Sequence, residues 1–154
     1  MSAFSAEQLG FIFSDALAEV VSTTSGFSLD VSSSEDDADL EDMVGIMSLY
    51  GKNQGMVFIS AEEFVIRVLC SYITGIPEDE VTRNEIDDTL CELVNMTAGN
   101  AKMRFNDADQ TFLLSSPLVI RGQNLSFITK KRINVISRVL RNEEISIKMK
   151  VFFY

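Results

Sequence analysis

The chain has 154 residues, of which 46% are hydrophobic and 23% are charged, a composition typical of a soluble globular protein and of one domain covering residues 1–154. Its two cysteines form no metal-binding pattern and histidine is lacking, which argues against a zinc site, and no apolar run reaches the length of a membrane span. The first residues lack the basic and apolar regions of an export signal, so we expect a cytoplasmic protein with reduced thiols.

Charge is distributed unevenly along the chain. Residues 1–100 contain 19 acidic and three basic residues, residues 101–154 contain four acidic and ten basic residues, and the net charge is −10. An acidic chain is a poor nucleic-acid binder because the phosphates repel it. The basic cluster 130–132 lacks interleaved aromatic residues and is better explained as a solvated turn.

The first half of the chain predicts two helices and a hairpin. Apolar residues at helical spacing predict a helix over Glu7–Ser25. An acidic loop follows over residues 32–42 and is too charged to pack. Val44–Tyr50 and Met56–Ser60 flank the turn sequence GKNQG and predict a β-hairpin. A second helix is predicted over Ala61–Thr74.

The second half predicts a long helix and then strands. Ile76 and Pro77, followed by three acidic residues, predict the start of a helix that runs to about Phe105, since acidic side chains in a first turn complement the helix dipole. The strands predicted after it are Thr111–Leu114, Leu118–Arg121, Leu125–Ile128, Val135–Leu140 and Ile145–Phe153. Helices combined with hairpins predict an α+β fold, with long helices packed on a largely antiparallel sheet.

The third helix carries poor helix formers on one face. At about 100° per residue its apolar face comprises Ile86, Leu90, Leu93, Thr97 and Ala101. The opposite face gathers Asp88, Glu92, Asn95 and Gly99. A glycine there lets another surface approach the helix closely, and an asparagine supplies hydrogen-bond donors and an acceptor.

Spacing alone is compatible with an ordinary solvated surface. A hydrolase with Asp88 and Glu92 as paired catalytic carboxylates would need a cleft that shifts their pKa values, and a convex helix face does not suggest one. The sequence shows no Ser-His-Asp triad, Cys-His pair or phosphate-binding glycine loop. Any chemistry on this face therefore uses few groups.

A faint internal repeat relates the third helix to the first. Shifting the segment 88–99 back by 73 positions places its Asp, Glu and Asn on Asp15, Glu19 and Ser22, in that order. Amphipathic helices often coincide at several positions, so duplication and coincidence both stay open.

The pattern Asp88-x3-Glu92-x2-Asn95, followed by MTAGNAK and later by Ser116-Pro117, resembles the signature of the CheC/CheX/FliY family of chemotaxis phosphatases. That signature has Asp or Ser, three residues, Glu, two residues, Asn, and a proline about 22 residues further on. Here 21 residues separate Asn95 from Pro117. The order of predicted elements also resembles the family, so the resemblance covers most of the chain. With one intact motif and one altered copy, the chain is similar to CheX.

The resemblance implies a CheC/CheX-like fold with a pseudo-repeat of the signature helix, and a phosphatase acting on the aspartyl-phosphate of a CheY-like response-regulator receiver domain. It implies that Asn95 orients the attacking water and that Glu92 docks against a lysine of the receiver, with Asp88 in a supporting role. Gly99 would provide steric clearance. The first-helix copy would be inactive because Ser22 cannot replace an amide.

The resemblance further implies that this chain binds no cofactor or metal itself, that the receiver contributes a divalent metal (Mg²⁺), and that two copies form a homodimer through their sheets. A non-catalytic module of the same fold, binding a receiver or another signalling partner, stays open as an alternative. A purely structural assembly protein would leave the polar face without a purpose. The basic C-terminal hairpin could serve the dimer contact or face acidic segments of its own chain, such as residues 32–42.

Overall fold

The computed structural model describes residues 5–33, 39–105, 112–130 and 133–154. The helices are α1 (Ala6–Ser25), α2 (Glu63–Thr74), the short 3-10 helix η1 (Glu78–Glu80) and α3 (Arg83–Met103). The strands are β1 (Asp30–Ser33), β2 (Met43–Tyr50), β3 (Gly55–Ala61), β4 (Leu113–Leu114), β5 (Leu118–Arg121), β6 (Ile136–Arg141) and β7 (Ser146–Phe153).

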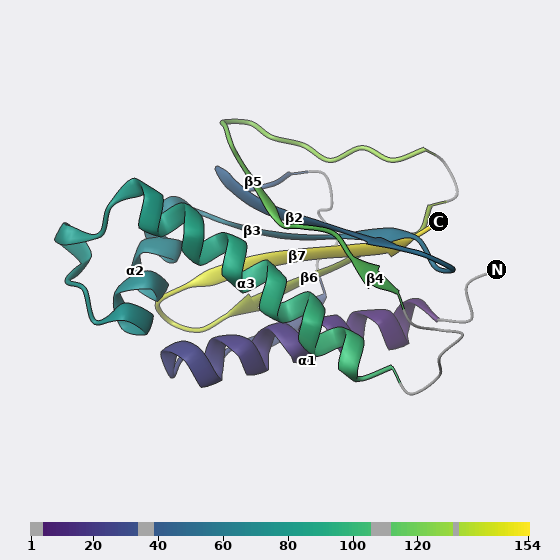
Figure 1. Cartoon of the computed structure of the whole chain (residues 1–154), viewed down its shortest axis with the longest axis horizontal. Coiled ribbons are helices and arrows are strands. Elements are labelled where there is room, and N and C mark those ends of the chain that lie inside the picture. Colours follow the sequence, from purple (N-terminus) through teal and green to yellow (C-terminus); the bar gives the residue numbers. More distant parts are fainter. Residues whose placement is uncertain (1–4, 34–38, 106–111, 131–132) are drawn as a thin grey trace.

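The strands form one antiparallel sheet with helices on it. The order across the sheet is β1-β6-β7-β3-β2-β4, and β5 also pairs with β2. The pairing of β3 with β7 joins the first predicted hairpin to the last one. Helices α1 and α3 run side by side in opposite directions along the sheet, with α2 beyond its end (Figure 1). The predicted α+β fold, with long helices on a largely antiparallel sheet, is confirmed.

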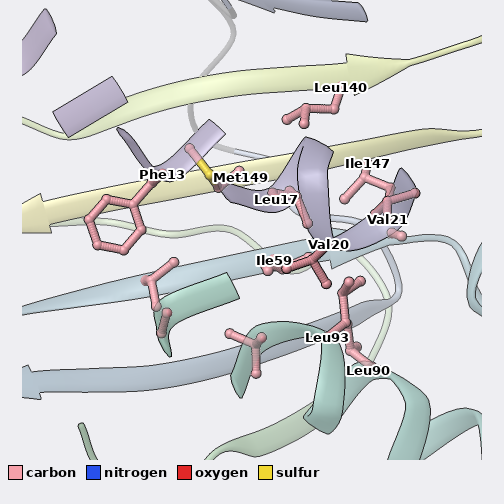
Figure 2. Packing of buried hydrophobic residues seen from close by; sticks show 14 of the residues in the cluster. Phe13, Leu17, Val20, Val21, Ile59, Leu90, Leu93, Leu140, Ile147 and Met149 are labelled. Atoms are coloured by element: carbon pink, nitrogen blue, oxygen red, sulfur yellow. The ribbon is translucent and has the colours of Figure 1, made fainter. Parts of the chain in front are cut away.

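Apolar side chains of α1 and α3 meet those of the sheet in one core. Phe13 and Leu17 of α1, Leu90 of α3, and Ile59 and Ile147 of the sheet are fully buried (Figure 2). Burying one such side chain contributes roughly 1.5–3 kcal/mol. Because the apolar stripe of α3 is held against the sheet in this way, the opposite face of that helix is fixed toward solvent.

Helix α3 approaches strand β2 closely at Gly45. A Cβ atom built on Gly45 would lie 3.1 Å from the Cγ atom of Leu90, which is tighter than ordinary van der Waals contact. The glycine therefore gives the Leu90 side chain room to lie on the sheet. This contact sets the height of α3 above the strands.

Helix α3 begins later than the sequence reading predicts. The acidic residues 78–80 form the separate helix η1, and α3 is capped by Thr82. The Thr82 hydroxyl accepts a hydrogen bond from the Glu85 backbone at 3.3 Å, while the Glu85 carboxylate accepts one from the Thr82 backbone at 3.1 Å. This capping box satisfies two backbone donors that a start at Pro77 would leave open, so the predicted start is wrong.

The predicted strand Leu125–Ile128 is also wrong. Its backbone makes an isolated bridge, between Ser126 and Asp39. Phe127 instead packs on the aromatic side chains of Phe58 and Phe152, at centroid distances of 4.5 and 5.3 Å. The segment therefore covers outward-facing aromatics of β3 and β7 rather than extending the sheet.

The acidic loop is tied to the sheet at both of its described ends. Residues 32 and 33 belong to β1, a strand that the sequence reading missed and that pairs with β6. At the other end, the Glu41 carboxylate lies 2.9 Å from the Lys148 ammonium of β7. The basic C-terminal hairpin thus contacts an acidic segment of its own chain. Residues 34–38 lie outside the described residues, as do Thr111 of the predicted strand Thr111–Leu114 and residues 131 and 132 of the basic cluster.

Candidate functional site on helix α3

The signature residues lie on the outward face of α3. Asp88, Glu92 and Asn95 are exposed, and Gly99 is half-buried one turn beyond Asn95. The residues predicted to face the core, Ile86, Leu90, Leu93, Thr97 and Ala101, are all buried. The structure therefore brings a carboxylate and an amide side chain together within one turn of an exposed helix surface.

Space is open above Gly99. Apart from the adjacent residues and the backbone of its own helix, a Cβ atom built at this position meets no atom within 4 Å. Packing inside the chain therefore does not require a glycine here, although glycine in a helix interior costs about 1 kcal/mol relative to alanine. The open space lies beside Asn95, on the surface that a partner would approach.

Arg121 of β5 ties α3 to the sheet edge and to α2. Its Nε atom donates to an Asp87 carboxylate oxygen at 2.8 Å, and its Nη1 atom lies 3.1 Å from a carboxylate oxygen of Glu63 at the start of α2. Asp87 directly precedes Asp88, so this pair positions the turn of α3 that carries the signature. The same strand follows Pro117, which links the proline of the motif to α3. Local spacing gives no signal for Arg121, because its partner lies 34 residues away.

The altered copy on α1 has a different environment. The guanidinium of Arg104, at the end of α3, forms ion pairs with both Asp15 and Glu19. Arg104 also donates from Nε to Asn100 at 2.7 Å, which fixes the guanidinium in place. Ser22 is exposed without an amide. The two carboxylates of the copy are therefore already engaged in ion pairs within the chain.

Cys91 lies on α3 beside the signature but is not activated. Burial raises the pKa of the Cys91 thiol, and the carboxylates of Asp88, Asp87 and Glu92 raise it further. The thiolate is the nucleophilic form of cysteine, so a thiol that stays protonated at neutral pH is a poor nucleophile. The site therefore offers an amide and carboxylates for chemistry, but no cysteine nucleophile.

An apolar groove borders the signature. It has a volume of about 310 Å³ and lies between the C-terminal turns of α1 and α2 and the middle of α3. Asp88 and Glu92 form part of its wall. The sequence predicts a convex helix face here and gives no signal for this groove, because the groove depends on how three helices meet.

The described ranges contain neither a metal-binding cluster nor a membrane-spanning helix. No group of three or more Asp, Glu or Cys side chains there could hold a metal ion. No helix in the same residues combines the length and apolarity needed to cross a bilayer.

Comparison with known proteins decides the family. The family model described as chemotaxis phosphatase CheX matches residues 43–139, which is more than half of the chain. The chain belongs to the CheX family. The matched region contains the whole signature on α3 and leaves out α1 with its altered copy. A comparison with curated protein sequences finds no match.

Solved structures share the fold of this CheX-family chain. A CheC-like superfamily protein from Shewanella sp. PV-4 is 24% identical with a TM-score of 0.80, over 95% of this chain and 98% of that one. Chemotaxis protein CheX from Vibrio vulnificus is 19% identical with a TM-score of 0.80, over 93% and 97%. A CheX–CheY–BeF3–Mg²⁺ complex from Borrelia burgdorferi gives 17% identity and a TM-score of 0.73, over 92% and 95%. These likenesses confirm the predicted CheC/CheX-like fold.

Proposed function

We propose that this chain hydrolyses the aspartyl-phosphate of a CheY-like receiver domain. The observation that carries the proposal is the exposed turn of α3 on which Glu92 and Asn95 stand together, beside the open space at Gly99. Membership of a chemotaxis phosphatase family supports it, and so does the existence of a complex between a CheX of the same fold and CheY.

The reaction requires positioning more than covalent chemistry. Water attacks the phosphorus in line with the bond to the receiver's aspartate, that P–O bond breaks, and inorganic phosphate and the free carboxylate are released. Asn95 would hold the water: its Oδ1 atom accepts a hydrogen bond from the water while its Nδ2 atom donates to a phosphoryl oxygen. The proton that the water loses passes to an oxygen of the phosphoryl group, which is released as inorganic phosphate, and the aspartate carboxylate is the leaving group. When bound in the receiver, Mg²⁺ supplies charge neutralisation for the phosphoryl oxygens.

Glu92 would fix the receiver in register with Asn95. Its carboxylate is exposed and lies one turn before Asn95. A lysine in the receiver's phosphorylation site is a suitable partner, because a charge-assisted hydrogen bond between ammonium and carboxylate gives both affinity and orientation. Asp88, one turn further back, adds a second carboxylate on the same side.

The experiment is phosphate release from a CheY receiver phosphorylated with acetyl phosphate in the presence of Mg²⁺. The wild-type chain is expected to accelerate release. Glu92→Lys replaces attraction by repulsion and is expected to raise the KM about tenfold or more. Glu143→Lys, which makes the same charge change in the exposed turn between β6 and β7, is the matched control and is expected to behave as wild type.

Two outcomes would contradict the proposal. If the wild-type chain binds the receiver without accelerating phosphate release, the chain is a non-catalytic receiver-binding module. If Glu92→Lys and Glu143→Lys change the KM equally, Glu92 does not dock the receiver. Circular dichroism of the three proteins separates either result from a folding defect.

A further inference from the structure

The groove beside the signature has an apolar floor and an acidic wall. Its floor and sides include Val20 of α1, Leu69 and Ile73 of α2, and Met96 of α3. Ile73 is 45% exposed, and Met96 is 37% exposed. The groove is therefore open to solvent and holds large apolar side chains that the chain itself leaves partly uncovered.

The charged residues that line the groove are all acidic. They are Glu85, Asp88 and Glu92, and no basic residue lies among the described residues of the lining. The Glu85 carboxylate is engaged by Thr82 in the helix cap. Asp88 and Glu92 therefore face whatever enters the groove, and they favour an occupant that carries positive charge beside its apolar part.

The groove and the signature share a wall. Asp88 and Glu92 belong to both, and Met96 is the residue next to Asn95. A partner that places a lysine against Glu92 therefore lies at the edge of the groove. The same partner is then close to the partly exposed side chain of Met96, which directly follows Asn95.

We propose that the groove seats an apolar side chain of the receiver, presented next to the receiver's lysine. This inference rests on the proposed phosphatase function and extends it to how the receiver is bound. The pairing of an apolar anchor with a neighbouring charge contact is a common way for an interface to obtain both affinity and register. Because the apolar anchor makes the same contact before and during hydrolysis, it contributes to the KM and not to kcat.

A second copy of this chain fits the groove less well. The chain carries a net charge of −10, and two copies that met at this acidic wall would repel each other. A small apolar ligand would fill the floor but leave Asp88 and Glu92 without a partner. A receiver with an apolar side chain beside its lysine satisfies both parts of the groove.

The test compares two serine substitutions at exposed apolar residues, in the same phosphate-release assay. Ile73→Ser removes apolar surface from the groove on α2, away from the signature helix. Met103→Ser removes apolar surface at a residue that is 77% exposed near the end of α3, outside the groove lining. Ile73→Ser is expected to raise the KM about tenfold with kcat unchanged, whereas Met103→Ser should match wild type.

Calorimetric binding of the BeF3- and Mg²⁺-loaded receiver provides a second readout that does not depend on hydrolysis. Weaker binding by Ile73→Ser, with wild-type thermal stability, supports the groove. Wild-type KM and affinity in Ile73→Ser overturn the groove inference and leave the proposed function intact. A wild-type chain that neither binds nor dephosphorylates the receiver overturns both. A concentration-dependent dimer that Ile73→Ser alone dissociates assigns the groove to a second copy and also overturns the inference.

Discussion

At the residue scale, Gly99 is a glycine that packing within the chain does not require. The position is helical and a Cβ atom would meet nothing within 4 Å, so the fold itself has no use for a glycine there. The neighbouring Asn95 is also a poorer helix former than alanine. Both residues lower helix stability on the one face of α3 that the core does not cover.

Gly99→Ala is expected to stabilise the folded chain by about 1 kcal/mol, because alanine is the better helix former. It is also expected to weaken receiver binding, because the added methyl group occupies the space through which the receiver would approach Asn95. Thermal denaturation and calorimetric binding measure the two effects separately. A stabilised variant with undiminished receiver affinity would show that Gly99 has no clearance role.

Cys91 gives a second residue-scale prediction. Because burial raises the pKa of its thiol, Cys91 is expected to react with iodoacetamide more slowly than a small-molecule thiol at pH 8, and to react faster as the pH rises. Cys91→Ser should keep wild-type phosphate release. Rapid labelling of Cys91 at neutral pH, accompanied by loss of activity, would contradict this assignment.

At the scale of elements, α3 depends on its capping box. The Thr82 hydroxyl and the Glu85 carboxylate bind each other's backbone, and they set the residue at which the helix begins. Thr82→Ala is expected to lower the free energy of unfolding by about 1 kcal/mol at pH 7. Urea denaturation of wild type and Thr82→Ala measures the difference.

The contribution of this capping box to folding stability depends on pH and decreases on acidification. The side-chain and backbone hydrogen bonds from Thr82 lower the pKa of Glu85 below its ordinary value of 4.5. A carboxylate whose pKa is lower in the folded state stabilises the fold above its unfolded pKa, and it loses that contribution as the pH falls through the folded pKa. The stability difference between wild type and Thr82→Ala is therefore expected to be constant above pH 6 and to shrink below pH 4. A difference that grows on acidification would contradict the cap.

Periodicity predicted the elements and faces that depend on local sequence. The 100° spacing placed Ile86 and Leu90 in the core and Glu92 and Asn95 outside, as observed, because one buried sheet face decides the orientation of a helix. The predicted start of α3 is too early because the acidic residues after Pro77 form the separate helix η1, whereas the Thr-x-x-Glu box sets the observed start. Strand β1 was missed because its partner, β6, lies about a hundred residues further along the chain.

Contacts between distant residues could not be predicted from spacing. Arg104 meets Asp15 across 89 residues, and Arg121 meets Asp87 across 34. Each guanidinium changes the environment of a carboxylate that the sequence alone marks only as acidic. The groove also could not be predicted from spacing, because residues of three helices form it.

At the scale of the whole molecule, α1 and α3 lie antiparallel on the sheet (Figure 1). The intact signature stands on α3, while the carboxylates of the α1 copy are held by Arg104 from the end of α3. We therefore infer one functional face per chain. The homodimer through the sheets and the extent of the domain stay predictions.

Asn95 is proposed to hold a water against the phosphate of another protein. The most direct test is single-turnover phosphate release from a phosphorylated CheY receiver with Asn95→Ala, compared with Asn84→Ala, an exposed amide in the first turn of the same helix. Loss of the positioned water is expected to lower the rate constant of Asn95→Ala about 100-fold, with affinity for the BeF3-loaded receiver unchanged, and Asn84→Ala should match wild type. A wild-type rate constant in Asn95→Ala would contradict the account.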